Sequence, residues 1–294
     1  MILLTGGTGT IGRAVLRRLT DAGSEPVRCL VRDPRRLGPD RVRVQLALGD
    51  LADPGTYRNA LRGVQTVIHL GASIRDQPSG SLEAINGLAT VRLVRAAERA
   101  GASRFVFFSA MGATAQSGAR FMRSKAKAAA AVATSDLQTT VFAPSIVYTP
   151  GDPWLSLLER MSLLPVMPVS GDGQAVYQPI WAEDVADCLI AALERPGGEG
   201  NREFALAGPQ SLSYDDVVRA ALRPLGRSRR LVHVPLPVVR AVLSGGERVM
   251  GPAVPATWEE AKLMEESMTS SRGTADAEAL GVNPLRMSAV LGSA

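Results

Sequence analysis

The sequence of 294 residues predicts an α/β fold, a doubly wound parallel sheet followed by a small, mostly helical C-terminal lobe. Two observations lead to this class. Short apolar segments alternate with longer segments of helical periodicity through the first 150 residues, which favours right-handed βαβ crossovers. Near Pro144 the chain changes to loops rich in proline and glycine, which marks a second part of the molecule.

The expected strands are residues 2–4, 26–31, 42–48, 65–70, 105–108 and 139–143, each a short apolar run. The expected helices between them begin near residue 10 and continue at 56–61, 82–100 and 121–132. Further on, 155–164 and 183–193 are expected to be helices and 201–206 a strand. Ser213 is expected to cap the next helix. We therefore expect a nucleotide-binding domain at 1–150, with 177–193 returning to it, and a substrate-binding lobe at 151–176 and 194–294.

A glycine-rich turn connects the first strand to the first helix. Gly6 or Gly7 permits a tight turn, Gly9 lets the backbone approach a pyrophosphate, and Gly12 lets the helix pack closely on the strand. The free N–H groups at the start of the helix then face the anion. The pattern predicts a Rossmann-type dinucleotide site whose phosphate contacts come from Gly6, Thr8, Gly9, Thr10, Ile11 and Gly12.

The end of the second strand indicates which dinucleotide binds. An acidic residue there selects the ribose hydroxyls of NAD, whereas an arginine accommodates the 2′-phosphate of NADP. Arg32 stands at this point, with Asp33 next and Arg35 and Arg36 close behind. NADP(H) is therefore favoured over NAD(H), although a solvated charged turn would give the same pattern.

The ends of the third and fourth strands extend the predicted site. Asp50 and Leu51 are placed to meet the adenine, and the small residues Gly71, Ala72 and Ser73 to let the chain pass the cofactor. Both groups follow parallel strands, where ligands of open α/β sheets bind. His69 lies inside the fourth strand without an evident carboxylate partner, and we expect it to be a packed histidine.

Several motifs together identify a family resemblance. They are TGGTGTIG at 5–12, GDL at 49–51, FVFFSAMG at 105–112, RSKA at 123–126, APSIVY at 143–148, PIWAEDVA at 179–186 and FALAGP at 204–209. This set resembles the extended and atypical members of the short-chain dehydrogenase/reductase superfamily, including NmrA-like proteins and accessory subunits of respiratory complex I. The resemblance implies an NAD(P)-binding Rossmann domain, with Lys125 and Pro144 among the cofactor contacts.

The resemblance also implies a catalytic Tyr-x-x-x-Lys motif accompanied by a serine, in which the lysine lowers the pKa of the tyrosine. Lys125 matches the lysine, but Phe121 occupies the tyrosine position and has no hydroxyl to transfer a proton. Ser109 ends the fifth strand, while Met111 stands where extended members place the serine. The catalytic candidates are thus Lys125, Ser109 and Tyr148. The lost hydroxyl would come from another direction, from Tyr148 or from Tyr177.

Composition narrows the functional classes. The net charge of +5 comes from scattered arginines without an aromatic-interleaved basic block, so no nucleic-acid partner is expected. Cys29 and Cys188 suggest no disulfide framework. No signal peptide or membrane span is evident, and we expect a cytoplasmic protein with a small-molecule substrate and no metal. The oligomeric state is not determined by the sequence, and an oligomer is possible.

Two functional hypotheses remain. The first is an NADP(H)-dependent reductase acting on a small quinone- or enone-like substrate without the usual tyrosine. The second is a non-catalytic NAD(P)-binding redox sensor or assembly factor of the NmrA-like kind. A sugar-nucleotide epimerase or dehydratase is disfavoured, because those reactions depend on the tyrosine still more.

Overall fold

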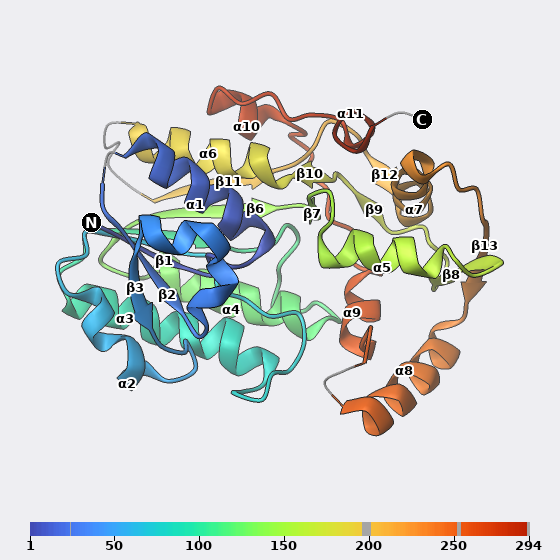
Figure 1. Cartoon of the computed structure of the whole chain (residues 1–294), viewed down its shortest axis with the longest axis horizontal. Coiled ribbons are helices and arrows are strands. Elements are labelled where there is room, and N and C mark those ends of the chain that lie inside the picture. Colours follow the sequence, from blue (N-terminus) through green and yellow to red (C-terminus); the bar gives the residue numbers. More distant parts are fainter. Residues whose placement is uncertain (24, 196–200, 252–253, 293–294) are drawn as a thin grey trace.

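The structure, a computed structural model, describes residues 1–23, 25–195, 201–251 and 254–292. Its centre is a seven-stranded sheet in the order β11-β6-β5-β4-β1-β2-β3, and all its neighbouring strands are parallel (Figure 1). The strands are β1 (Ile2–Thr5), β2 (Val27–Val31), β3 (Gln45–Leu48), β4 (Thr66–His69), β5 (Arg104–Phe108), β6 (Gln138–Pro144) and β11 (Arg202–Leu206). The predicted doubly wound α/β class is confirmed. The strand order reverses between β1 and β4, and ligands of such sheets bind in the crevice at that point.

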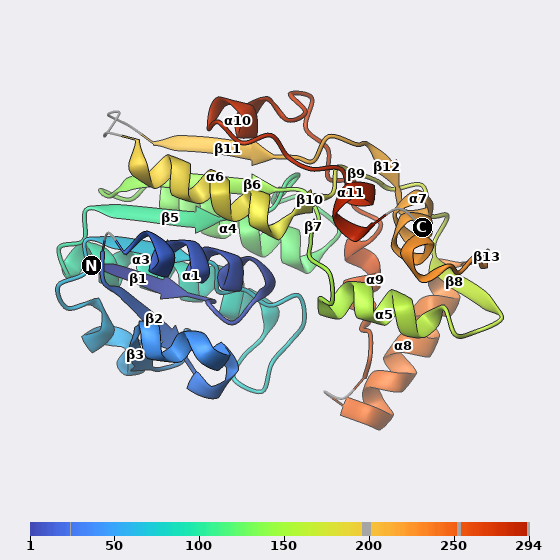
Figure 2. The same cartoon turned by 45° about the horizontal axis from the view of Figure 1, so that its top comes forward.

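Helices cover both faces of the sheet. One face carries α1 (Thr10–Ala22) and α6 (Ala182–Glu194), and the other carries α2 (Pro54–Tyr57), α3 (Ala89–Arg99) and α4 (Arg120–Ala133) (Figure 2). Alternate residues of each strand serve the two layers, so that Leu4 packs under α1 while Leu3 packs on the α3 side. Burial on both faces explains why the strands are continuously apolar.

One predicted boundary was wrong. Residues 42–48 were expected to form the third strand, but β3 begins only at Gln45, because Pro34–Arg43 forms a 3-10 helix. The Asp33 side chain caps this helix by accepting from the N–H of Arg35, and Gly38 bends it with a φ of +62°. Val42 consequently lies on the surface with 83% of its area exposed.

The second part of the chain forms the lobe to the right of the sheet in Figure 1. It contains α5 (Pro153–Met161), α7 (Tyr214–Leu222), α8 (Leu236–Met250), α9 (Trp258–Leu263) and α11 (Met287–Leu291), whereas α10 (Ala275–Ala279) lies over the sheet. Three two-stranded ladders accompany them: β7 (Val147–Tyr148) with β10 (Ile180–Trp181), β9 (Val176–Tyr177) with β12 (Leu212–Ser213), and β8 (Val166–Ser170) with β13 (Arg230–Val234). Ser213 caps α7 through the N–H of Asp216, as predicted.

Residues 194–294 were expected to form the second part of the lobe, but β11, near the start of this range, contributes to the central sheet. β11 pairs with β6 along its full length, and α10 packs on β11. The division at residue 150 stays a prediction. In the described part of the chain, no helix combines the length and the apolar character needed to cross a membrane.

Candidate functional site

The turn between β1 and α1 is built for glycine. Gly6 has a φ of +76°, and a Cβ on it would lie 2.6 Å from the backbone nitrogen of Gly71. A Cβ on Gly12 would lie 2.1 Å from the carbonyl oxygen of Gly6, so that position must be glycine for α1 to approach the turn. Gly9 has more room, its nearest neighbour being 3.4 Å away. The turn thus forms a cradle open to a ligand above Gly9.

The first turn of α1 faces this cradle. Gly9 is the N-cap, and the helical hydrogen bonds begin with the N–H of Arg13, which donates to Gly9 at 3.0 Å. The N–H groups of Thr10, Ile11 and Gly12 precede that bond and are the unpaired donors of the helix start. No side chain caps them and no acidic residue occupies the first turn. This end of the helix is therefore suited to a phosphate.

A cavity of about 340 Å³ opens at the switch point of the sheet. Nine of the predicted cofactor residues line it together: Gly6, Thr8, Gly9, Arg32, Asp50, Leu51, Gly71, Ala72 and Ser73. Thr10, Ile11 and Gly12 lie at the adjoining helix start, whereas Lys125 and Pro144 are not part of the lining. Arg36, Gln77, Ser79 and Ile85 also line the cavity, and these were absent from the predicted contacts.

Arginines surround the mouth of the cavity at the end of β2. Arg32 is half exposed, and its Nη1 lies 3.9 Å from Oδ2 of Asp50. Arg13 donates from Nη2 to the carbonyl oxygen of Arg36 at 2.9 Å, and so holds that residue near the glycine turn. Asp33 is occupied by Arg35, whose guanidinium lowers the pKa of the carboxyl group. This leaves Arg32 and Arg36 as the charged groups of the β2 end that line the cavity.

Asn86 shapes the side of the cavity formed by Ser73. It is buried in a π-helical turn, Ala84–Leu88, that precedes α3. Its side chain accepts from the N–H of Ser73 at 2.8 Å and donates to the carbonyl oxygen of Ser73 at 2.6 Å. An amide is the side chain that satisfies both backbone groups at once. Sequence reasoning missed Asn86, whose signal was a polar residue among the apolar positions of a predicted helix.

His69 is a packed histidine, as predicted. Nδ1 lies 2.7 Å from Thr5 Oγ1 and Nε2 lies 2.8 Å from Thr90 Oγ1, so both ring nitrogens have hydroxyl partners. Burial, with a smaller contribution from the charge of Lys125, lowers the pKa of His69 to about 3. The ring is therefore neutral at physiological pH and connects β1, β4 and α3.

Lys125 lies in the interior, on α4. Only 3% of its area is exposed, and Nζ donates to the carbonyl oxygen of Phe108 at 2.6 Å. Nζ also lies 4.9 Å from the ring centre of Phe107 and 5.7 Å from that of Phe121. Burial lowers the pKa of Lys125 to about 7. Phe121 thus stands beside the amine that a catalytic tyrosine would need.

The other catalytic candidates are also buried. Ser109 follows β5 with 9% of its area exposed, and Met111 packs in the core of the lobe. Tyr148 is fully buried, and among the described residues its hydroxyl has no hydrogen-bond partner. Burial raises the pKa of Tyr148. Tyr148 pairs with Trp181 in the ladder of β7 and β10, and its role as an alternative source of the hydroxyl stays a prediction.

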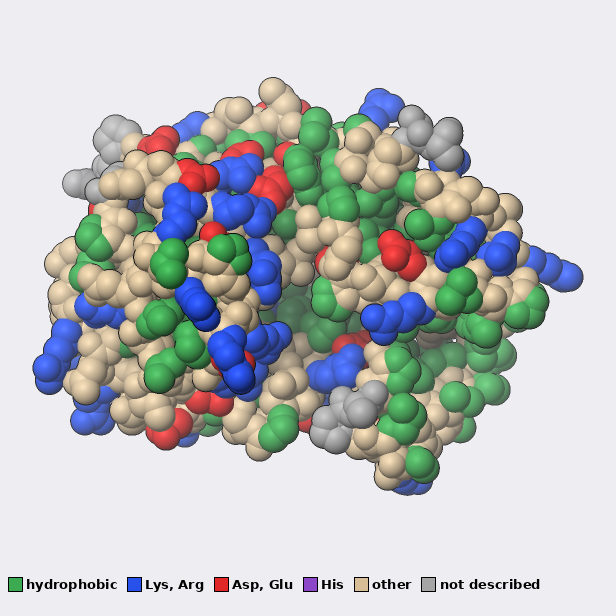
Figure 3. Space-filling model, in the orientation of Figure 1, with side chains coloured by type: hydrophobic (Ala, Val, Ile, Leu, Met, Phe, Trp, Pro, Cys, Tyr) green, Lys and Arg blue, Asp and Glu red, His purple; other side chains and the backbone are tan. Residues whose placement is uncertain are grey.

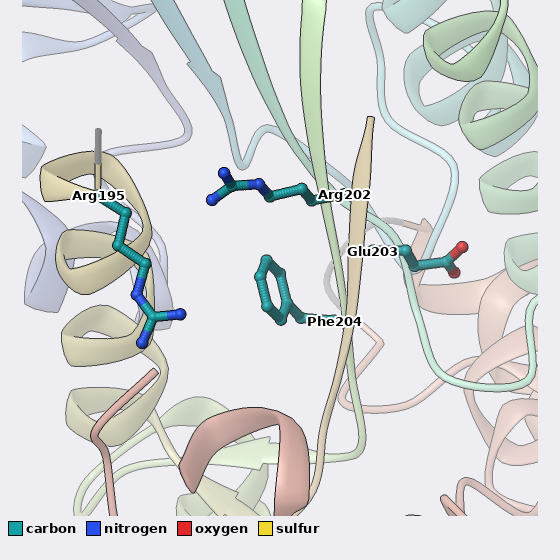
Figure 4. Close-up of a pocket in the computed structure, with 4 residues that line it drawn as sticks. All are labelled: Arg195, Arg202, Glu203 and Phe204. Atoms are coloured by element: carbon teal, nitrogen blue, oxygen red, sulfur yellow. The ribbon is translucent and has the colours of Figure 1, made fainter. Parts of the chain in front are cut away.

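A second hollow lies at the first residues of β11. Figure 4 shows Arg202 and Phe204 pointing into it from β11, Arg195 pointing into it from the end of α6, and Glu203 pointing away. Arg195 is engaged by the carbonyl oxygen of Ala279, and Phe204 stacks on Phe142. This is the amino end of a parallel strand, opposite to the cofactor cradle, and we assign no site to it.

Comparison with known proteins agrees with the geometry. A family model described as NAD(P)H-binding matches residues 6–196. The chain is 31% identical over 246 residues to an NAD(P)H azoreductase of Xenophilus azovorans, covering 83% of this chain and 81% of that protein. It is 26% identical over 247 residues to the photosystem II assembly factor Ycf39 of Trieres chinensis, covering 82% and 74% respectively.

A solved structure shows the same fold. A nucleoside-diphosphate-sugar epimerase from Staphylococcus aureus superposes with a TM-score of 0.76 at 19% identity, covering 99% of both chains. The family model spans the glycine cradle, the Arg32 loop and α4, which are the parts that form the site. The chain therefore belongs to the NAD(P)H-binding family, within the extended and NmrA-like part of the short-chain dehydrogenase/reductase superfamily.

Proposed function

We propose that this chain is an NADP(H)-dependent reductase that acts on a small conjugated acceptor of the quinone or enone type. The observation that carries the proposal is an intact glycine cradle in a molecule whose buried lysine is flanked by Phe121 rather than a tyrosine. An enzyme of this kind needs an acceptor that takes a hydride without simultaneous proton donation from a tyrosine. Quinones and enones meet that need, because conjugation spreads the negative charge that follows hydride addition.

The preference for NADP(H) is supported by the charges at the cavity mouth. Arg32 and Arg36 line the cavity, while the carboxylate of Asp33 is turned to Arg35. A guanidinium binds a phosphate through paired hydrogen bonds, and it gives the 2′-phosphate of NADP a partner that NAD does not use. Asp50, which lies near Arg32, is left to bind the adenine side.

Different residues of the chain would bind different parts of the cofactor. Gly6, Gly9 and the start of α1 would hold the pyrophosphate, and Arg32 and Arg36 the 2′-phosphate. When bound, the nicotinamide supplies a hydride. The reduced acceptor then takes one proton from water or from Lys125, whose pKa of about 7 lets it exchange a proton near neutral pH. Holding the reactants together in the right orientation contributes much of the rate in such a reaction.

The test is oxidation of NADPH, followed by absorbance, with a panel of quinones, enones and azo dyes, the last prompted by the azoreductase relative. We expect turnover with conjugated acceptors, little turnover with simple ketones, and a lower KM for NADPH than for NADH. Tight NADPH binding without turnover across the panel would overturn the reductase proposal.

A second candidate function is suggested by Phe121. With a phenylalanine in place of the family's tyrosine, the protein would bind NAD(P)H without catalysis and act as a redox sensor or assembly factor. The likeness to a photosystem II assembly factor supports this reading. Its test is co-purification of the native protein with a partner whose retention depends on NADPH. Unaided turnover by the purified chain would exclude it as the main role. An epimerase role is disfavoured, because Phe121 lacks the hydroxyl on which that reaction depends. The epimerase structure, at 19% identity, shows only that the fold is shared.

A further inference from the structure

Exposed apolar side chains gather on one corner of the lobe. Fifteen large hydrophobic residues are exposed in the described part of the chain, and nine of them come from three segments. The first runs from the end of α5 through β8, the second contains β13 and the residues just before it, and the third is α8. The nine residues are Leu163, Leu164, Val166, Leu225, Val232, Val238, Val242, Val249 and Met250. We call this the β8–β13–α8 surface. Figure 3 shows hydrophobic and basic side chains mixed over this corner, at the right of the molecule.

The helix α8 contributes most to this surface. It has fifteen residues and contacts α9, yet no residue of it is buried. Val238, Val242 and Val249 are exposed by 50%, 66% and 87%, and their spacing of four and seven residues places them on one stripe of the helix. An exposed stripe of this kind on a helix is a mark of an interaction surface.

The same corner carries a strong positive charge. Residues 158–166 and 223–250 contain seven arginines and only two glutamates. The arginines are Arg160, Arg223, Arg227, Arg229, Arg230, Arg240 and Arg248. Among the residues that the structure describes, none of the seven has a carboxylate within ion-pair distance. Arg227 and Arg229 instead donate to backbone carbonyls of the α5 end, and Arg240 lies over the ring of Trp258.

We propose that the β8–β13–α8 surface docks on an anionic lipid bilayer. α8 lies in the plane of the interface with its valine stripe among the headgroups, and the surrounding arginines contact lipid phosphates. Charge complementarity selects this occupant over a second copy of the chain. A symmetric dimer through this corner would bring the same unpaired arginines against one another. The proposal is independent of the reductase function, since it uses no residue of the cofactor site.

The experiment is flotation of the full-length protein with vesicles of phosphatidylcholine alone or mixed with phosphatidylglycerol. We expect binding only to the anionic vesicles and release by high salt. Val242→Glu combined with Val249→Glu should reduce binding at least about tenfold, because carboxylates on the stripe oppose insertion among anionic headgroups. Val42→Glu is the control, since Val42 is 83% exposed but lies in the 3-10 helix beside β3, outside the β8–β13–α8 surface, and it should leave binding unchanged.

A second pair of variants tests the charge separately. Arg230→Gln and Arg248→Gln should each weaken vesicle binding about fivefold. Arg41→Gln, an exposed arginine outside this corner, should not change it. Thermal unfolding verifies that each variant is folded. Absence of binding to anionic vesicles, equal loss in the control variants, or a dimer in solution that the valine variants split would each overturn the proposal.

Discussion

Nζ of Lys125 donates to the carbonyl oxygen of Phe108 at 2.6 Å and so ties the middle of α4 to the last residue of β5. The amine also lies over the rings of Phe107 and Phe121, which offer their faces but no proton acceptor. Lys125 therefore has a structural contact that connects the helix to the sheet. Its part in catalysis stays a prediction.

The buried lysine predicts a pH-dependent stability. Its pKa is about 7 in the folded protein against an ordinary 10.5, so between these values the unfolded chain holds a proton that the folded chain has released. The free energy of unfolding should therefore gain up to ~1.4 kcal/mol per pH unit from this group as pH rises above 7. Denaturant unfolding between pH 7 and 8.5 should show this slope, and Lys125→Met should remove it. Lys127→Met, on the exposed side of α4, should keep it. Equal slopes for all three proteins would show that Lys125 is not desolvated.

Restoring a hydroxyl at position 121 should create a new activity. In Phe121→Tyr the phenol would extend from a ring whose centre lies 5.7 Å from Lys125 Nζ, and a positioned proton donor contributes about 100-fold or more to carbonyl reduction. NADPH-dependent reduction of simple ketones and aldehydes should rise by that order. Phe121→Leu removes the ring without adding a hydroxyl and should stay at the wild-type background. If Phe121→Tyr binds NADPH normally and gains nothing, the site lacks room for a carbonyl substrate.

The cavity arginines should discriminate between the two dinucleotides. Arg32→Ala should raise the Kd for NADPH about 10- to 100-fold, because a charged hydrogen-bonded partner of the 2′-phosphate is lost, and should leave the Kd for NADH nearly unchanged. Isothermal titration with both cofactors measures this. Arg41→Ala is the matched control, since Arg41 lies in the 3-10 helix that follows β2, is exposed and does not line the cavity. Equal weakening of NADPH and NADH binding by Arg32→Ala would rule out the 2′-phosphate role.

Substitutions at two glycines of the cradle should affect the stability of the protein and its affinity for NADPH differently. Gly12→Ala places a Cβ 2.1 Å from the backbone of Gly6, and overpacking of this kind costs about 2–3 kcal/mol, or several degrees in Tm. The Cβ of Gly9→Ala would meet no atom closer than 3.4 Å, so the Tm should stay unchanged. The affinity for NADPH should fall, because the new Cβ stands where the backbone approaches the pyrophosphate. Differential scanning fluorimetry with and without NADPH distinguishes the two effects. A stable Gly12→Ala protein would mean that α1 can retreat from the turn.

Much of the sheet could be predicted, because buried parallel strands are continuously apolar and each is closed by turn residues. The exceptions have local causes. Residues 42–44 were mistaken for strand since the apolar alternation there belongs to a surface 3-10 segment capped by Asp33. The strand at 201–206 was recognised as a strand, but its composition could not reveal that it pairs with β6, more than sixty positions earlier.

Nine residues that line the cavity could be predicted as well, because glycines and strand ends have fixed roles in this fold. The surroundings of Tyr148 and Asn86 could not. Burial of Tyr148 depends on a two-residue ladder with Trp181, and the role of Asn86 depends on one π-helical turn, neither of which has a periodic signature. Arg36 lies at the cavity because Arg13 holds its carbonyl group, a contact between segments that sequence spacing does not show.

The pairing of β11 with β6 has a consequence for synthesis on the ribosome. The glycine cradle and six strands of the sheet are complete once residue 144 has emerged, but the strand that covers the edge of β6 ends only at Leu206. At about 5–20 residues per second, the edge stays unpaired for several seconds or more. An open edge of an apolar sheet is a template for wrong pairing. The nascent chain should therefore be vulnerable to aggregation, and should need a chaperone, while residues 145–206 are emerging.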